Sequence, residues 1–87
     1  MIRLIFAPAF LRQLTALPID LQEEAIERVE LFKHRTNHQF LKVHKLKGSL
    51  RGVLSFSVNY RIRILFQWST SQEAELLAIG DHDVYRD

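Results

Sequence analysis

Apolar residues change their spacing once along the chain, and this change constrains the fold more than any other feature of the sequence. In the first half, up to about residue 35, they recur every three to four residues, whereas between residues 53 and 80 they alternate with other residues. The first spacing is typical of amphipathic helices and the second of strands with one buried face. Helices that precede a run of strands are typical of an α+β domain, in which the helices cover one face of a sheet.

One strand and two helices are predicted in the first half. The strand spans residues 2–7, and the proline after it favours the first turn of a helix. A second proline separates this helix from the next, which we expect to begin with Asp20 as its cap and Glu23 in a capping box, and to close at residues 33–35. Because the break between the helices is short, we expect them to be antiparallel neighbours.

Alternating residues in the second half predict three strands, over residues 53–58, 61–68 and 73–80. A four-residue turn at 69–72 places Ile64 opposite Leu77 and Arg61 opposite Gly80. For the preceding hairpin, a turn with an odd number of residues, such as 58–60, keeps the apolar side chains of both strands on the same face.

These patterns lead to a prediction for the whole chain, residues 1–87, as one α+β domain. Its two N-terminal helices are expected to pack on one face of a mostly antiparallel twisted sheet of about four strands. The expected order is strand, helix, helix, strand, strand, strand. Trp68 falls in the series that faces the helices and is expected to pack there rather than to stack on a ligand.

Positive charge is concentrated in the middle of the chain. The formal net charge is only +2, yet residues 34–63 contain no Asp or Glu. Such a segment is typical of a protein that binds a polyanion or an acidic protein partner, although a merely solvated basic face remains an alternative. The basic residues that we single out are Lys45, Lys47, Arg51, Arg61 and Arg63.

Several classes of function are disfavoured by composition. The chain has no cysteine, which excludes disulfides, thiolate nucleophiles and cysteine zinc sites. His34 and His38 are four residues apart, but the helix is expected to end before them and no third ligand is placed, so no metal site is predicted. His44 is expected to position a loop. Since no apolar run approaches the roughly 20 residues of a membrane span, we expect a cytoplasmic protein without membrane contact.

The C-terminal residues "IGDHDVYRD" follow the last predicted strand and carry several titratable side chains. The predicted register sends His82 to the face of Arg61 and Arg63. Cleavage of RNA by attack of a 2′-hydroxyl on the adjacent phosphate needs a proton acceptor, a proton donor and cations around the phosphate. An unperturbed imidazole titrates near neutrality, so His82 suits proton transfer, while the arginines suit phosphate binding and Tyr85 suits stacking or hydroxyl donation. A solvated tail, with His82 paired to a neighbouring aspartate, is the alternative.

The order of elements, together with "HKLKGSLRG", "NYRIRILF" and "IGDHDVYR", resembles the RelE/ParE superfamily of bacterial toxin–antitoxin toxins over essentially the whole chain. In this resemblance Arg61 matches a phosphate-binding arginine, and His82 with Tyr85 matches the end of the messenger-RNA interferase branch. The resemblance implies a toxin of a type II system, an endoribonuclease that cleaves mRNA on the ribosome and is silenced by an acidic antitoxin. It implies no metal and no cofactor.

The chain also departs from that family pattern. Lysines that the RelE pattern carries along the first meander strand are replaced by Val53, Leu54, Ser55 and Phe56, and His82 stands where an arginine is expected. The ParE branch has the same fold but inhibits DNA gyrase without catalytic residues, which gives the main alternative function. A third possibility is an inactive protein that only binds an antitoxin or its operator complex.

Overall fold

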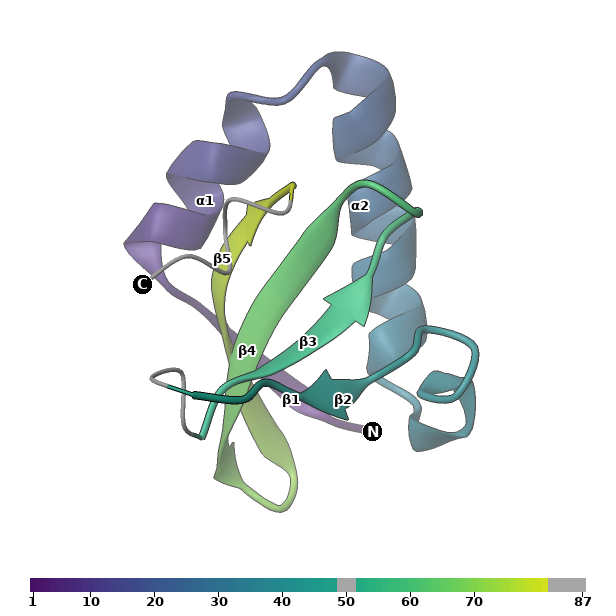
Figure 1. The fold of residues 1–87 in the computed structure, drawn as a ribbon, viewed down its shortest axis with the longest axis vertical. Coiled ribbons are helices and arrows are strands. Elements are labelled where there is room, and N and C mark those ends of the chain that lie inside the picture. Colours follow the sequence, from purple (N-terminus) through teal and green to yellow (C-terminus); the bar gives the residue numbers. More distant parts are fainter. Residues whose placement is uncertain (49–51, 82–87) are drawn as a thin grey trace.

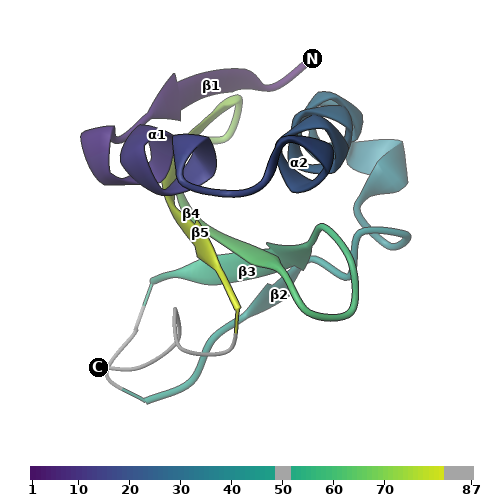
Figure 2. The same cartoon turned by 90° about the horizontal axis from the view of Figure 1, so that it is seen from above.

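The computed structural model describes residues 1–48 and 52–81, which form two α-helices, one short 3-10 helix and five strands. In chain order the elements are β1 (Arg3–Phe6), α1 (Pro8–Thr15), α2 (Ile19–Phe32), η1 (Arg35–Asn37), β2 (His44–Lys45), β3 (Leu54–Ser57), β4 (Arg63–Thr70) and β5 (Glu73–Gly80). The two α-helices run in opposite directions and lie on one face of the sheet (Figures 1 and 2). The predicted α+β class is therefore confirmed.

The sheet has the strand order β1-β5-β4-β3-β2. β1 pairs with β5 in parallel, and the three other neighbouring pairs are antiparallel, as predicted for a mostly antiparallel sheet. The sheet has one strand more than expected because β2 contributes an edge strand of only two residues. Two residues are too few for alternation to be recognised in a sequence.

Aromatic side chains join α2 to the middle of the sheet. The ring of Phe32, at the end of α2, stacks on Phe56 of β3 at a centroid distance of 4.5 Å and meets Phe66 of β4 edge-on at 4.7 Å. All three side chains are fully buried. Such pairs add roughly 0.5–1.5 kcal/mol each to the burial of the rings, so this cluster is a main source of the attraction between helices and sheet.

The ends of α2 differ from the prediction. The helix begins at Ile19, with Pro18 in the cap position and its carbonyl accepting a hydrogen bond from the amide of Gln22 at 3.0 Å. Asp20 therefore lies in the first turn, where its Oδ1 accepts from the amide of Leu21 at 3.0 Å, so the predicted cap position and its capping box with Glu23 are wrong. Since the helix starts directly after a residue that lacks an N–H, one fewer amide needs a partner there.

At the other end, α2 stops at Phe32 and is closed by side chains of the next segment. Nδ2 of the Asn37 side chain donates to the Leu31 carbonyl at 2.8 Å, and His38 Nε2 lies 2.8 Å from the Phe32 carbonyl. Because a carbonyl only accepts, Nε2 of His38 carries the proton. His38 thus closes the helix through Nε2. Among the described residues there is no group of three His, Cys, Asp or Glu side chains that could hold a metal ion.

The hairpin between β4 and β5 has a tighter turn than predicted. Both strands extend toward a turn at residues 71–72, and Ile64 pairs with Ile79 instead of Leu77. Irregularities in the pairing lie between Leu65 and Phe66 and near the turn. The predicted pairing of Arg61 with Gly80 is therefore wrong, because Arg63 occupies the position opposite Gly80.

The hairpin between β3 and β4 has an odd turn, as predicted, but it spans residues 59–61. The amide of Val58 donates to the Ile62 carbonyl at 2.9 Å, and Phe56 pairs with Ile64. The observed turn is shifted by one residue from the predicted one but still has an odd number of residues. The apolar side chains of both strands therefore stay on the sheet face that the helices cover. On the other face of the sheet Ser55 is 0% exposed, so that face is also covered at this position.

Candidate functional site

Arg63 lies where β3, β4 and β5 end together. It pairs with Ser57 of β3 and Gly80 of β5, and it alternates with the core residue Ile64, so its side chain starts from the face that the helices do not cover. Its Nη1 donates to the carbonyls of Asn59 and Ile62. Carbonyl oxygens orient a guanidinium without cancelling its charge, so Arg63 remains available to an anion.

The side chain of Asn59 organises the turn that precedes Arg63. Its Oδ1 accepts from the amides of Arg61 and Ile62, each at 2.8 Å, and its Nδ2 donates to Oε1 of Glu24 on α2 at 2.9 Å. An asparagine at the first position of a turn is well suited to such bonds. One side chain therefore fixes the turn internally and ties it to the helix layer.

Arg61 and Arg63 line different pockets on either side of this turn. Arg61 lines a pocket of about 190 Å³ together with Leu21 of α2. Arg63 lines a cleft of about 240 Å³ together with Arg28 of α2 and Lys42. The two pockets share the turn residues Asn59 and Tyr60. Gly80, the last residue of β5, pairs with Arg63 rather than with Arg61.

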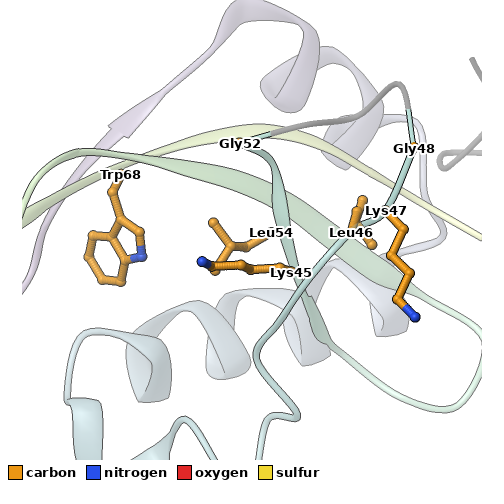
Figure 3. A pocket seen from close by; sticks show the side chains of 7 residues that line it. All are labelled: Lys45, Leu46, Lys47, Gly48, Gly52, Leu54 and Trp68. Atoms are coloured by element: carbon orange, nitrogen blue, oxygen red, sulfur yellow. The ribbon is translucent and has the colours of Figure 1, made fainter.

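A third hollow, of about 680 Å³, lies between Lys45, Lys47 and the indole of Trp68 (Figure 3). The Lys45 side chain extends past Leu54 toward Trp68, whereas Lys47 points away from it. Leu54 and Leu46 contribute apolar surface to the hollow. This combination suits a ligand with a flat apolar part and a negative group.

Trp68 itself is packed against the core, as predicted. Its ring meets Phe66 edge-on at a centroid distance of 5.6 Å, and the guanidinium of Arg35 lies 4.8 Å from its ring centroid. Arg35 also donates to the Ser71 carbonyl in the β4–β5 turn. The cation–π contact was not predicted, since the two residues are 33 positions apart in the sequence.

Of the other predicted residues, Arg51, His82 and Tyr85 lie outside the described residues. His44 donates through Nδ1 to the Lys42 carbonyl, 2.8 Å away, within the segment that leads into β2. This contact agrees with the predicted positioning role. Residues that sequence reasoning did not single out are Phe40 and Tyr60, whose rings are largely exposed.

Comparison with known proteins identifies the fold but gives no match in sequence. No protein-family model matches the chain, and no curated protein sequence is significantly similar to it. None of the helices in residues 1–48 and 52–81 is long and apolar enough to cross a membrane.

Several solved structures superpose on nearly the whole chain. The YoeB/ParE toxin from Agrobacterium tumefaciens has a TM-score of 0.74 at 15% identity, covering 93% of this chain and 99% of that one. The archaeal RelE–RelB complex from Pyrococcus horikoshii gives 0.69 at 14% identity, covering 99% and 98%. The YoeB–YefM complex from Staphylococcus aureus gives 0.71 at 15% identity, covering 94% and 98%. At these identities the likeness establishes a shared fold.

Proposed function

From the fold that this chain shares with RelE- and YoeB-type toxins, we propose that it is the toxin of a type II toxin–antitoxin system and a metal-independent endoribonuclease. Its proposed substrate is mRNA associated with the ribosome in the cytoplasm. The observation that carries the proposal is Arg63, which within residues 1–48 and 52–81 is oriented by carbonyls alone and whose strand partner is Gly80, two residues before His82.

The proposed reaction is an attack of the ribose 2′-oxygen on the adjacent phosphorus. A bond forms between the 2′-oxygen and phosphorus, and the bond to the 5′-oxygen of the next nucleotide breaks. The 2′-hydroxyl loses its proton and the 5′-oxygen gains one, so the products are a 2′,3′-cyclic phosphate and a 5′-hydroxyl. No water molecule and no metal ion are consumed in this step.

Each predicted residue has a role in that reaction. His82 is the proposed acid or base, because imidazole is the side chain suited to proton transfer near pH 7. Arg61 and Arg63 hold the phosphate and stabilise its developing charge, and Tyr85 stacks on a base or donates its hydroxyl. RNA or ribosome contacts are assigned to Lys45, Lys47 and Arg51.

A cognate antitoxin is the proposed protein partner. The similar toxin structures from Pyrococcus horikoshii and Staphylococcus aureus are complexes with RelB and YefM. The basic segment 34–63 of this chain has no acidic residue, so an acidic antitoxin would complement its charge. Coverage of Arg61 and Arg63 by such a partner would also block the phosphate site.

The proposed nuclease is tested by alanine substitution at His82 and at Tyr85. We expect His82→Ala to slow message cleavage in a translating extract by about 10²–10⁴-fold, the range of a lost acid or base. Arg12→Gln is the matched control, since it removes an exposed charge on α1. Undiminished cleavage and growth arrest in both alanine variants would refute the assignment.

DNA gyrase inhibition is the second candidate, because one of the similar structures is described as a YoeB/ParE toxin. The two functions differ in their target. Inhibition of supercoiling by the purified protein, with message left intact in the extract, would favour gyrase over RNA. Cleavage of message without an effect on supercoiling would favour the nuclease.

A further inference from the structure

A cleft beside the β3–β4 turn combines cations with exposed aromatic rings. Its volume is about 240 Å³, and it lies between the turn, α2 and the segment that leads from η1 to β2. Arg28 and Arg63 line it from α2 and β4, while Phe40 and Lys42 line it from the connecting segment and Tyr60 from the turn. Among the described residues, those that line it include no Asp or Glu.

The cations in this cleft differ in how much charge they offer. Arg28 forms an ion pair with Glu27 at 2.6 Å and donates through Nε to the Val58 carbonyl at 3.1 Å, so its charge is largely balanced. Arg63 and Lys42 form no ion pair within residues 1–48 and 52–81. The cleft therefore offers two uncompensated positive charges, one from each wall.

The two aromatic rings are unusually accessible. Tyr60 is 84% exposed at the tip of the turn, and Phe40 is 65% exposed. The guanidinium of Arg28 lies 5.5 Å from the Phe40 ring centroid, which holds this ring at the rim of the cleft. Burying an aromatic ring is favourable, so two exposed rings beside two free cations indicate a surface that is covered by a ligand.

The backbone of the segment between η1 and β2 is held in a defined conformation around Lys42. Its backbone has a φ of 59°, the left-handed region that a lysine rarely adopts. The Leu41 carbonyl before it accepts from the amide of Ser57 at 2.8 Å, and the carbonyl of Lys42 itself contacts His44. These contacts place the Lys42 side chain at the cleft.

The chemistry of this cleft suits single-stranded RNA. Stacking on an exposed ring requires a base that is not already stacked in a duplex, and the phosphate next to that base needs a cation nearby. Arg63 also belongs to the phosphate site described above, so a strand held there continues into the cleft. An acidic protein segment would use the cations but would leave the exposed rings without a flat partner.

We propose that this cleft, lined by Phe40, Lys42, Tyr60 and Arg63, binds a nucleotide of the RNA substrate outside the cleaved bond. A base stacks on Tyr60, and a phosphate lies between Lys42 and Arg63. This inference rests on the proposed function, because it names a further part of the binding site for the same RNA.

The test measures binding without cleavage. A fluorescent 2′-O-methyl oligouridine has no free 2′-hydroxyl and cannot be cleaved, and its affinity is followed by anisotropy over a salt series. We expect Tyr60→Ala to weaken binding about tenfold, within the range of one lost stacked base. Tyr60→Phe keeps the ring and should bind within about twofold of the unchanged protein. Because Tyr60 is exposed, neither substitution should affect folding.

Charge is tested separately from stacking. Lys42→Asn removes the ammonium and suits the left-handed backbone, so the fold is retained. It should reduce the slope of log affinity against log salt concentration by about 0.7, the value for one lost contact to a single strand. Arg12→Gln removes an exposed charge on α1, a helix that contributes no residue to the lining of the cleft, and should leave that slope unchanged.

The proposal is overturned if Tyr60→Ala binds within about twofold of the unchanged protein, or if the salt slopes of Lys42→Asn and Arg12→Gln are equal. It is also overturned if Tyr60→Ala weakens binding of an acidic antitoxin but not of the oligouridine. Loss of cleavage in His82→Ala with retained oligouridine binding supports both proposals. A protein that binds the oligouridine through Tyr60 but never cleaves message contradicts the proposed nuclease alone.

Discussion

Replacing Asn59 with alanine removes three hydrogen bonds that organise the β3–β4 turn. The Asn59 side chain accepts from the amides of Arg61 and Ile62, each at 2.8 Å, and donates to Glu24 at 2.9 Å. The carbonyl of Asn59 also accepts from Arg63. The substitution therefore acts on the local geometry of both candidate phosphate-binding arginines, although neither arginine is changed.

The size of the effect follows from these bonds. Two bonds to backbone amides contribute roughly 0.5–1.5 kcal/mol each, and the half-buried bond to the carboxylate adds about 1 kcal/mol. The free energy of unfolding should therefore fall by about 2–4 kcal/mol. For a domain of this size, each kcal/mol lowers Tm by roughly 4–8 °C, so a decrease of about 8–32 °C is expected by calorimetry or circular dichroism.

Asn59→Asp provides a matched variant. Its carboxylate still accepts from the two amides, but it faces the Glu24 carboxylate across the distance of the lost bond. Like charges at this separation repel, so Asn59→Asp should be destabilised as well. In the Asn59→Asp variant, adding Glu24→Gln supplies a donor to the new carboxylate and removes one of the two charges. The free energy of unfolding should then rise by about 1 kcal/mol, a gain that Glu24→Gln alone does not give in the unchanged protein. Such non-additive effects would show that residues 59 and 24 interact directly across the turn and α2.

A melting temperature of Asn59→Ala within about 3 °C of the unchanged protein would show that the Asn59 side chain does not stabilise the turn. Additive effects of Asn59→Asp and Glu24→Gln would refute the link between the turn and α2. In either case the turn would be held by the strands alone.

The remaining predictions concern the core, the Trp68 contact and the loop after β2. Phe32→Ala should lower the free energy of unfolding by about 3–5 kcal/mol, because the buried ring leaves a cavity between α2 and the sheet; chemical denaturation measures this loss. Arg35→Gln should shift the fluorescence of Trp68, the one tryptophan in the chain, and cost about 0.5–1 kcal/mol; an unchanged spectrum would contradict the cation–π contact. Gly52→Ala should cost about 1–2 kcal/mol, since its φ is 83°, while Gly52→Asn should cost less; equal melting temperatures for both would contradict this explanation.

The period of the apolar residues was sufficient to predict the α+β class and the order of the main elements. It was not sufficient to predict the register of β4 and β5. Strict alternation places Leu77 with Ile79 on the core face, whereas the buried residues are Ala74, Leu76 and Ile79. An irregularity in the pairing near Leu65 lets the buried side of β5 change phase within the strand. When every second residue of a strand is assumed to be buried, a position at which the buried face switches cannot be recognised from the sequence.

The candidate site was predicted in part. Arg61, Arg63, Lys45 and Lys47 were singled out by charge, but charge does not say which pocket each side chain lines. The two-residue shift in register moved Gly80 from Arg61 to Arg63. Contacts between distant segments, such as Arg28 with Phe40, depend on how helix and loop pack and have no local signature in the sequence.

The central claim is that the chain cleaves message by attack of the 2′-oxygen. Its most direct test is the chemistry of the RNA ends formed when the purified protein is added to a translating extract. We predict fragments that end in a 2′,3′-cyclic phosphate and begin with a 5′-hydroxyl, and we predict that they are absent with His82→Ala. Fragments that begin with a 5′-phosphate, or intact message together with inhibited gyrase, would contradict the claim.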